Sequence, residues 1–252
     1  MHNEYPVCGT KTSRSGNRVR QITYADIARR LGISCERVRQ IANRQKIKEQ
    51  AKTIRNSLFH SITALAYALE AKDIYTSRHS QKVTEISVAL AKELGLLRNN
   101  IEEIQLAGLI HDIGKIGVKE SVLNKPGKLT QEEFQLMRLH SEIGEHILKP
   151  VIEDEEILKI VRHHHERYDG NGYPDRMKSK QIPLGARIVA VADTYDAMTS
   201  KRPYREAMDP EKACAEIKCC RGSQFDPEVV DIFLEMRNSL IPSISHYIET
   251  RM

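Results

Sequence analysis

Apolar residues recur at three- and four-residue steps through most of the chain, which is the spacing of one face of an α-helix. Helices are predicted over 54–96, 99–115, 130–148, 155–165, 184–200, 210–220 and 227–238. Alternation with a period of two, the signature of a strand, is limited to short stretches near 181–189. The pattern predicts an all-α fold, a helical bundle without internal repeats.

Several residues mark where the predicted helices begin. Thr130 and Glu133 have the spacing of a capping box, in which each side chain bonds to the backbone N–H of the other residue. Pro210 and Pro227 stand at first-turn positions, where a missing N–H costs no helical hydrogen bond. These signals support separate helices in the C-terminal part of the chain.

The N-terminal region has a different pattern. Residues 1–20 are polar and rich in Ser, Gly and Arg, which predicts a flexible basic tail. Within 21–56, Thr23 and Asp26 form a capping pair, Gly32 permits a tight turn, and Ser34 caps a second helix. The apolar positions of these two helices are Ile27, Ala28, Leu31, Val38 and Ile41. A helix, a short turn and a second helix make up a helix-turn-helix.

Three arginines and a glutamine lie on or near the predicted outer side of the second helix. Such side chains suit phosphates and base edges in a DNA major groove. They are Arg37, Arg39, Gln40 and Arg44. The stretch "ERVRQI" (36–41) resembles the DNA-reading helix-turn-helix in the fourth region of bacterial sigma factors. The resemblance implies DNA binding through residues 21–50; the alternative is a basic hairpin that packs on the body or on another subunit.

Composition and charge divide the chain in two. The chain of 252 residues, with 40% hydrophobic and 29% charged residues, fits a globular protein with one core and a small appendage. Residues 1–56 hold 13 Lys and Arg against 4 Asp and Glu, whereas the remainder holds 26 against 30. We therefore expect a tail (1–20), a helix-turn-helix segment (21–56) and a larger catalytic domain (57–252) with different partners.

The sequence also limits location and chemistry. It has neither the apolar run of about 18 residues that suggests a membrane span nor an apolar N-terminal leader. We expect a cytoplasmic protein without a membrane partner. The five cysteines include no CxxC pair, which argues against a disulfide framework and a thiolate zinc site. Nitrogen and oxygen must therefore hold any metal.

Polar residues with metal-binding side chains interrupt the predicted apolar faces. They are His79, His111, Asp112, His140, His164, His165 and Asp193. A single histidine on such a face is usually a structural residue, but burying this whole set without a common partner would be costly. A shared cation removes the cost, since imidazole and carboxylate are ligands of Fe, Mn and Zn. Adjacent residues such as His111 and Asp112 point about 100° apart on a helix, so the pair can contact two metals.

Two motifs identify a family that the chain resembles. "HDIGK" (111–115) together with "HHERYDGNGYP" (164–174) resembles the HD-GYP domain, a subgroup of the HD phosphohydrolases. The likeness extends from about 58 to 238 and includes "YTSRHS", "LHSEIG", "VADTYDAMTSKRPYR" and "GSQFDPEVV". It implies an HD-type helical bundle with a small N-terminal helix-turn-helix. It also implies hydrolysis of cyclic di-GMP to the linear dinucleotide pGpG, with GMP as a further product.

The resemblance assigns roles by position. Metal binding falls to the seven residues above, with Asp112 bridging two metals, and the catalytic residues are Asp112, Lys115 and Asp196. Substrate binding falls to Lys115, Tyr173, Arg202 and Arg205. Members with three metals carry Glu where this chain has Tyr75, so we expect two divalent metals, Fe or Mn.

The expected chemistry follows from such a centre. Metals lower the pKa of coordinated water, and hydroxide bridging them attacks phosphorus while cations stabilise the phosphoryl oxygens. Lys115 follows the paired ligands closely enough to act as one of those cations. Asp196 either orients a metal ligand or takes a proton; the alternative is a surface acid.

The loop after His165 is expected to turn sharply beside the metals. Gly170 and Gly172 tolerate positive φ, Asn171 suits a turn, and Pro174 stiffens the exit. Tyr173 offers a flat surface for a guanine base. In the resembled family, the loop that corresponds to Gly172–Pro174 also contacts diguanylate cyclase domains.

Two alternatives to cyclic di-GMP hydrolysis stay open from sequence. One is an HD phosphohydrolase that acts on another cyclic dinucleotide or on a nucleotide. The other is a DNA-binding transcriptional regulator whose bundle senses cyclic di-GMP without turning it over.

Overall fold

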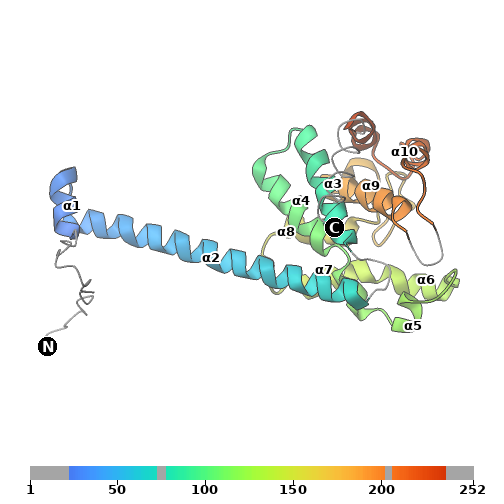
Figure 1. Cartoon of the computed structure of the whole chain (residues 1–252), viewed down its shortest axis with the longest axis horizontal. Coiled ribbons are helices and arrows are strands. Elements are labelled where there is room, and N and C mark those ends of the chain that lie inside the picture. Colours follow the sequence, from blue (N-terminus) through green and yellow to red (C-terminus); the bar gives the residue numbers. More distant parts are fainter. Residues whose placement is uncertain (1–22, 73–77, 202–205, 237–252) are drawn as a thin grey trace, which may run out of the picture. The chain divides into compact units, whose positions relative to one another are not determined.

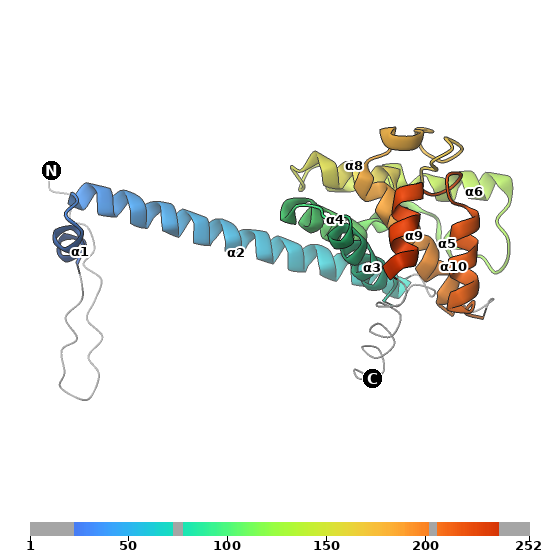
Figure 2. The same cartoon turned by 90° about the horizontal axis from the view of Figure 1, so that it is seen from above.

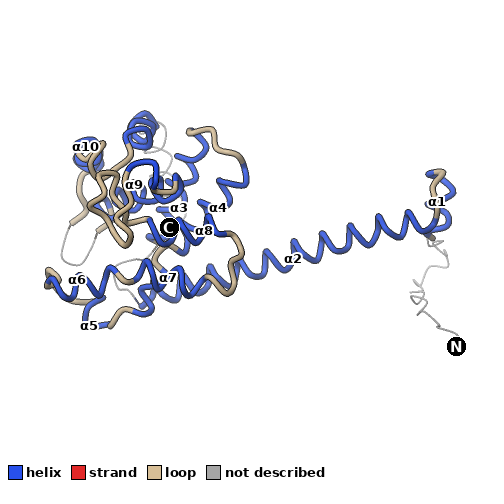
Figure 3. Tube along the Cα trace, turned by 180° about the vertical axis from the view of Figure 1, so that it is seen from behind, coloured by secondary structure: helices blue, strands red, loops and turns tan. Residues whose placement is uncertain are grey.

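The computed structural model describes residues 23–72, 78–201 and 206–236. Over these residues the chain is helical, and its one β-type feature is an isolated bridge between Arg221 and Phe225. Figure 3 shows blue helices joined by tan loops throughout. The prediction of an all-α fold is confirmed. The chain separates into two compact units, Met1–Ser57 and Leu58–Met252.

The first unit contains α1 (Tyr24–Leu31) and the beginning of α2 (Cys35–Lys72). The predicted capping pair is present: the Asp26 backbone N–H donates to Thr23 Oγ1 at 3.2 Å, and the Thr23 N–H donates to Asp26 Oδ2 at 3.0 Å. Gly32 ends α1 with φ +65°, which allows the sharp turn into α2.

The apolar face predicted for this unit is only partly buried. Ala28 and Val38 are buried, whereas Leu31 is 63% exposed and Ile41 is 53% exposed. The reason is length, because the eight residues of α1 can cover only one side of α2. Leu31 and Ile41 are thus apolar positions at helical spacing that the structure leaves exposed.

The second unit contains the last part of α2 and ten further labelled elements. They are α3 (His79–Glu93), α4 (Arg98–Ile110), the 3-10 helix η1 (Ile113–Gly117), α5 (Glu120–Leu123), α6 (Gln131–Arg138), α7 (His140–Leu148), α8 (Glu155–His163), the 3-10 helix η2 (Ser179–Gln181), α9 (Leu184–Thr199) and α10 (Pro210–Cys219). Residues 227–236 form one more helix. The prolines predicted to open helices, Pro210 and Pro227, do so.

One hydrophobic core holds the second unit together. α3 packs against α4 and α9, α8 packs against α4 and α7, and α10 packs against α9. Figure 1 and the view from above in Figure 2 both show α3, α4 and α9 side by side. Val83, Leu90, Ile110, Val161 and Ile188, each at most 1% exposed, lie in this core. Ile62 and Leu69 of α2 belong to it as well.

The helix predicted over 99–115 ends at Ile110 and is followed by the 3-10 helix η1. Two further predicted helices are interrupted, and both interruptions position a histidine. The run over 54–96 gives way to a new helix that begins at His79, after Arg78 with the left-handed φ of +64°. The segment 130–148 keeps its capping box at Thr130 and Glu133, but it divides at Leu139 so that α7 begins at His140. Apolar periodicity continues across both breaks, and for this reason the sequence pattern did not show them.

None of the described helices combines the length and the apolar composition that a membrane span requires.

Candidate metal centre

The predicted metal ligands come from the ends of four helices and from the middle of a fifth. His79 and His140 are the first residues of α3 and α7, and His111 directly follows α4. His164 directly follows α8, while Asp193 lies within α9. Helix ends project side chains past the packed backbone, so these residues can meet in one place.

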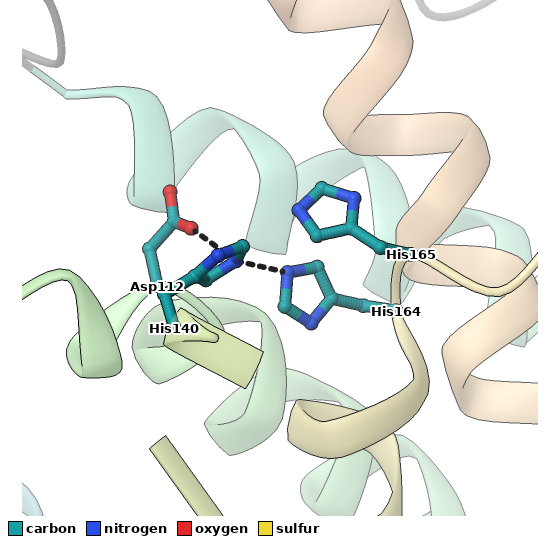
Figure 4. Close-up of side chains that lie close together, drawn as sticks. All are labelled: Asp112, His140, His164 and His165. Atoms are coloured by element: carbon teal, nitrogen blue, oxygen red, sulfur yellow. Dashed lines mark hydrogen bonds and ion pairs between the residues drawn. The ribbon is translucent and has the colours of Figure 1, made fainter. Parts of the chain in front are cut away.

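The structure brings the seven residues together in two groups. Within each group the potential ligand atoms all lie within 4.8 Å of one another. One group is Asp112, His140, His164 and His165; the other is His79, His111 and Asp193. Figure 4 shows the side chains of the first group pointing toward one another. The adjacent residues His111 and Asp112 fall into different groups.

Asp112 lies between the two groups and faces both. Its Oδ1 is 3.5 Å from His140 Nε2 in the first group. Its Oδ2 is 3.3 Å from His111 Nε2 and 3.9 Å from His79 Nε2 in the second. The carboxylate therefore has the geometry of a bridging ligand, with one oxygen available to each group.

The backbone fixes the orientation of three of the imidazoles. Each donates its Nδ1–H to the carbonyl oxygen three residues earlier, at 2.7 Å: His111 to Gly108, His140 to Met137, and His164 to Val161. A carbonyl oxygen only accepts, so the proton must be on Nδ1. Nε2 of each neutral ring is then left with a lone pair, as a metal ligand requires.

His79 is oriented by a carboxylate instead of a carbonyl. Its Nδ1 is 2.6 Å from Asp196 Oδ2, and its Nε2 is 3.2 Å from Asp193 Oδ1. Asp196 is itself held by the Ser200 hydroxyl at 2.9 Å and by Lys82 at 3.5 Å, and it is only 3% exposed. Of the roles open to Asp196 in the sequence, this position matches that of a residue orienting a ligand.

Burial and charge set the protonation of the cluster. Burial lowers the pKa of His164 well below its usual value and that of His165 to about 3, and neighbouring imidazoles add to both effects. Both rings are therefore neutral. Burial would lower the pKa of His79, but its hydrogen bonds to Asp193 and Asp196 raise it to about 10.

The donor set fits divalent metals, as two observations show. Nε2 of His111 is buried and has no hydrogen-bond partner among the described residues. Nε2 of His140 and Nε2 of His164 face each other at 3.3 Å, although the Nδ1 bonds leave each with a lone pair. Two opposed lone pairs repel unless a cation or a proton lies between them. Nitrogen and carboxylate donors of this kind suit Fe, Mn and Zn.

Lys115 of η1 is part of the same cluster. Its Nζ lies 2.7 Å from Asp112 Oδ2, and its side chain is 19% exposed. Burial would raise the pKa of Asp112, but the positive charge of Lys115 holds it well below the usual value. Lys115 thus places a positive charge at the edge of the ligand groups.

A cavity of about 240 Å³ adjoins the ligands. Its lining includes the predicted ligands His164, His165 and Asp193 together with Tyr173 and Arg138. The Tyr173 ring lies 4.9 Å from the His165 ring, and the Arg138 guanidinium lies over Tyr173 at 4.5 Å from the ring centroid. Tyr173 thus lies beside the predicted metal ligands, and its contact with the substrate stays a prediction.

The sequence interpretation missed Arg138 and Phe134, which also line this cavity. The signal that could have found them is their spacing of four residues on α6, directly before the predicted ligand His140. Phe134 is 45% exposed, and its ring lies 6.3 Å from that of Tyr173 in an edge-to-face arrangement.

The two glycines of the loop after His165 have different functions in the fold. Gly170 has φ +85°, as predicted. Gly172 does not have a positive φ; a Cβ there would lie 2.3 Å from the Arg167 nitrogen and 2.5 Å from Glu166 Cα. Glycine is therefore required at Gly172 by close backbone contact, and of these two glycines only Gly170 uses the tolerance of positive φ.

Other predicted site residues belong to the first unit or lie outside the described residues. Arg202 and Arg205 are outside, as are Tyr75 and the tail 1–20. The residues proposed to contact DNA are all exposed on α2: Arg37, Arg39, Gln40 and Arg44. Arg39 is paired with Glu36 at 3.0 Å, and Arg37 donates to Gln40 at 3.5 Å.

Comparisons with known proteins agree with this geometry. A cyclic di-GMP phosphodiesterase of Thermotoga maritima is 41% identical over 187 residues, which are 73% of this chain and 50% of that protein. A 3′3′-cGAMP-specific phosphodiesterase of Vibrio cholerae is 38% identical over 179 residues, 69% of this chain and 40% of that protein. The chain thus spans about half the length of the curated relatives it matches.

A solved structure has the same fold. The HDG"Y"P protein Bd1817 of Bdellovibrio bacteriovorus superimposes with a TM-score of 0.54 at 21% identity, covering 64% of this chain and 52% of that one. The profile of the HD domain family matches residues 63–229, which is more than half of the chain and includes all seven predicted ligands. The chain belongs to the HD domain family.

Proposed function

We propose that the chain is a metal-dependent phosphodiesterase of the HD-GYP type that hydrolyses cyclic di-GMP to pGpG, with GMP as a further product. The observation that carries the proposal is the position of Asp112 between two groups of imidazole and carboxylate side chains. Two adjacent metal sites that share a carboxylate suit in-line displacement at phosphorus. The relatives named above, which act on cyclic dinucleotides, support the substrate class.

The two groups would hold two divalent metals, and we propose Fe or Mn. His79, His111 and Asp193 would bind one, and His140, His164 and His165 the other, with Asp112 shared. Metals bound there supply positive charge to the phosphoryl oxygens and lower the pKa of a coordinated water. The reaction adds water to phosphorus and breaks the bond to the ribose 3′ oxygen, which leaves a 5′-phosphate and a free 3′-hydroxyl.

The residues of the chain contribute charge and position. Lys115 Nζ, held at 2.7 Å from Asp112, can donate to a phosphate oxygen located between the two groups. Asp196 fixes the ring of His79 through Nδ1, so that Nε2 faces the site. On the basis of the resemblance, we propose that Arg202 and Arg205 hold the substrate phosphates.

The test is hydrolysis of cyclic di-GMP by protein freed of metal and then loaded with Mn²⁺, or with Fe²⁺ without oxygen. We expect pGpG as a product on chromatography. Asp112→Asn should lower kcat/KM at least about 100-fold. Replacing a residue that only supports a metal ligand already costs up to about 100-fold, and Asp112 is a proposed ligand itself. Glu102→Gln, at a half-buried position of α4 outside the two ligand groups, is the matched control. Protein with bound metal and no product, or full activity of Asp112→Asn, would refute the proposal.

The choice of cyclic di-GMP over other substrates is tested separately. Cyclic di-GMP, 3′3′-cGAMP and cyclic di-AMP are compared by kcat/KM under the same metal loading. We expect cyclic di-GMP to give the highest value. A higher value for another cyclic dinucleotide would reassign the substrate but would leave the phosphodiesterase proposal in place.

As a second candidate function, we propose DNA binding by residues 21–50. The left-handed turn at Gly32 between α1 and α2 and the exposed basic residues of α2 favour it. Basic side chains on phosphates displace counterions, so the affinity should fall steeply with salt. The test is a gel-shift series between about 50 and 200 mM salt. A protein that makes several phosphate contacts loses much of its affinity for DNA over this range. No retardation, or retardation that is independent of salt, would contradict the proposal.

A further inference from the structure

We infer that Arg138 recognises a guanine base of the substrate, and thereby selects guanine-containing cyclic dinucleotides. The inference rests on the proposed phosphodiesterase function and adds a specificity-determining residue to it. It starts from the cavity of about 240 Å³ that the metal ligands His164, His165 and Asp193 share with Arg138 and Tyr173.

Arg138 differs from the other partly buried arginines in its surroundings. Arg162 lies 2.8 Å from Glu145, Arg167 lies 2.7 Å from Asp169, and Arg187 pairs with Asp226. Arg138 forms no ion pair with any residue that the structure describes. Its one side-chain hydrogen bond within those residues is a 3.4 Å contact from Nη1 to Gln135 Oε1.

Aromatic rings hold the Arg138 guanidinium in place. Its carbon lies 4.5 Å from the Tyr173 ring centroid and 5.9 Å from that of Phe134. A guanidinium placed over an aromatic face keeps its N–H donors in its own plane, where they remain free to bond to a ligand. Tyr173 thus supports Arg138, and the flat surface expected to stack a base is already in contact with a cation.

The size and position of the cavity indicate what enters it. At about 240 Å³ it is smaller than the roughly 300–1,000 Å³ of pockets that enclose a whole drug-sized ligand. With the scissile phosphate at the metal ligands beside Lys115, the adjoining cavity accommodates one nucleoside of the dinucleotide. The guanidinium then meets the edge of its base.

Hydrogen-bond chemistry selects guanine at this edge. Guanine presents two adjacent acceptors, O6 and N7, which match two N–H donors of one guanidinium. Adenine presents the N7 acceptor beside an N6 donor, and an arginine has no acceptor to offer that donor. If adenine were bound there, its N6 donor would face an N–H donor of the guanidinium, and no hydrogen bond could form between them.

The test compares Arg138→Met and Arg138→Lys with wild type on three substrates: cyclic di-GMP, cyclic di-AMP and bis(p-nitrophenyl) phosphate, which has no base. For Arg138→Met, we expect kcat/KM on cyclic di-GMP to fall about tenfold to hundredfold, the value of one bidentate pair to a base. Activity on bis(p-nitrophenyl) phosphate and on cyclic di-AMP should stay within about threefold of wild type, since neither makes that pair. Arg138→Lys keeps the positive charge but loses the two side-by-side N–H donors of the guanidinium. Its activities should therefore resemble those of Arg138→Met.

Arg98→Met is the matched control, because Arg98 is exposed on α4 and pairs only locally with Glu102. An equal loss on both cyclic dinucleotides would show that Arg138 binds phosphate or sugar, and would overturn the inference. So would a wild type that hydrolyses cyclic di-AMP as fast as cyclic di-GMP. If the metal-loaded wild type cleaves no cyclic dinucleotide, the proposed function fails and the inference fails with it.

Discussion

At the scale of single residues, the site depends on which nitrogen of each histidine carries the proton. Three rings donate Nδ1–H to a carbonyl of the preceding turn, an arrangement that needs only a histidine at the end of a helix. His79, the first residue of α3, has a partner for Nδ1 from another part of the chain. That partner is Asp196 of α9, and this contact connects residues 117 positions apart.

The role of Asp196 can be measured through metal affinity. Asp196→Ala should weaken the binding of Mn²⁺ about 10- to 100-fold, because His79 loses the acceptor that orients Nε2 toward the site. Asp196→Asn keeps an oxygen acceptor but loses the charge, so its affinity should lie between those of Ala and wild type. Competition against a metal-sensitive dye measures the constants without relying on activity. Equal affinity in all three proteins would show that Asp196 does not orient a ligand.

At the scale of elements, the contact between η1 and α7 holds two ligands of the first group, Asp112 and His140, close together. Asp112 precedes η1 and His140 begins α7, so the separation of these elements sets the separation of the two ligands. Gly114 makes the close approach possible, since a Cβ at this position would lie 1.8 Å from the carbonyl oxygen of His140. The glycine of "HDIGK" is therefore explained by packing and not by a positive φ.

This contact predicts a difference between two glycines of the same 3-10 helix. Gly114→Ala should lower the free energy of unfolding by about 3 kcal/mol, because the new methyl group meets the backbone of His140, which must move. This value is at the upper end of what extra atoms in a packed core usually cost. Gly117→Ala meets only the side chain of Ile143, at 3.0 Å, which can rotate away. Its cost should be about 1 kcal/mol or less. Urea unfolding of the two variants provides the comparison, and equal costs would count against the packing argument.

At the scale of the whole molecule, the ligands join five helices of the second unit, so metal binding should stabilise its fold. A ligand that binds only the folded state at about 100 times its Kd adds about 2.7 kcal/mol. For a domain of this size we expect Tm to rise by roughly 5–10 °C with Mn²⁺. Asp112→Asn should show a much smaller rise, whereas Glu102→Gln should match wild type. Differential scanning calorimetry with and without chelator measures the shift. An unchanged Tm on addition of Mn²⁺ would argue against the proposed metal centre.

The helical class, most helix positions and the identity of the candidate ligands could be predicted from sequence, since they depend on local signals. Apolar periodicity marks a buried face, the caps at Thr23 and Thr130 involve residues only three positions apart, and the "HDIGK" and "HHERYDGNGYP" motifs are contiguous. The exposure of Leu31 and Ile41 could not be predicted in this way. It depends on how much of α2 a neighbouring helix covers, and the pattern of one helix does not contain that information.

The sequence alone determined which chemical groups are available: seven imidazole and carboxylate side chains, a lysine beside them, and a glycine-containing loop. Only the tertiary structure decided how they divide into two groups, that Asp112 faces both, and that Asp196 supports His79. It also placed Arg138 and Tyr173 against each other at the cavity. The physical reason is distance: helix propensity and capping act over three or four residues, whereas these contacts join separate helices whose positions are set by packing of the shared core.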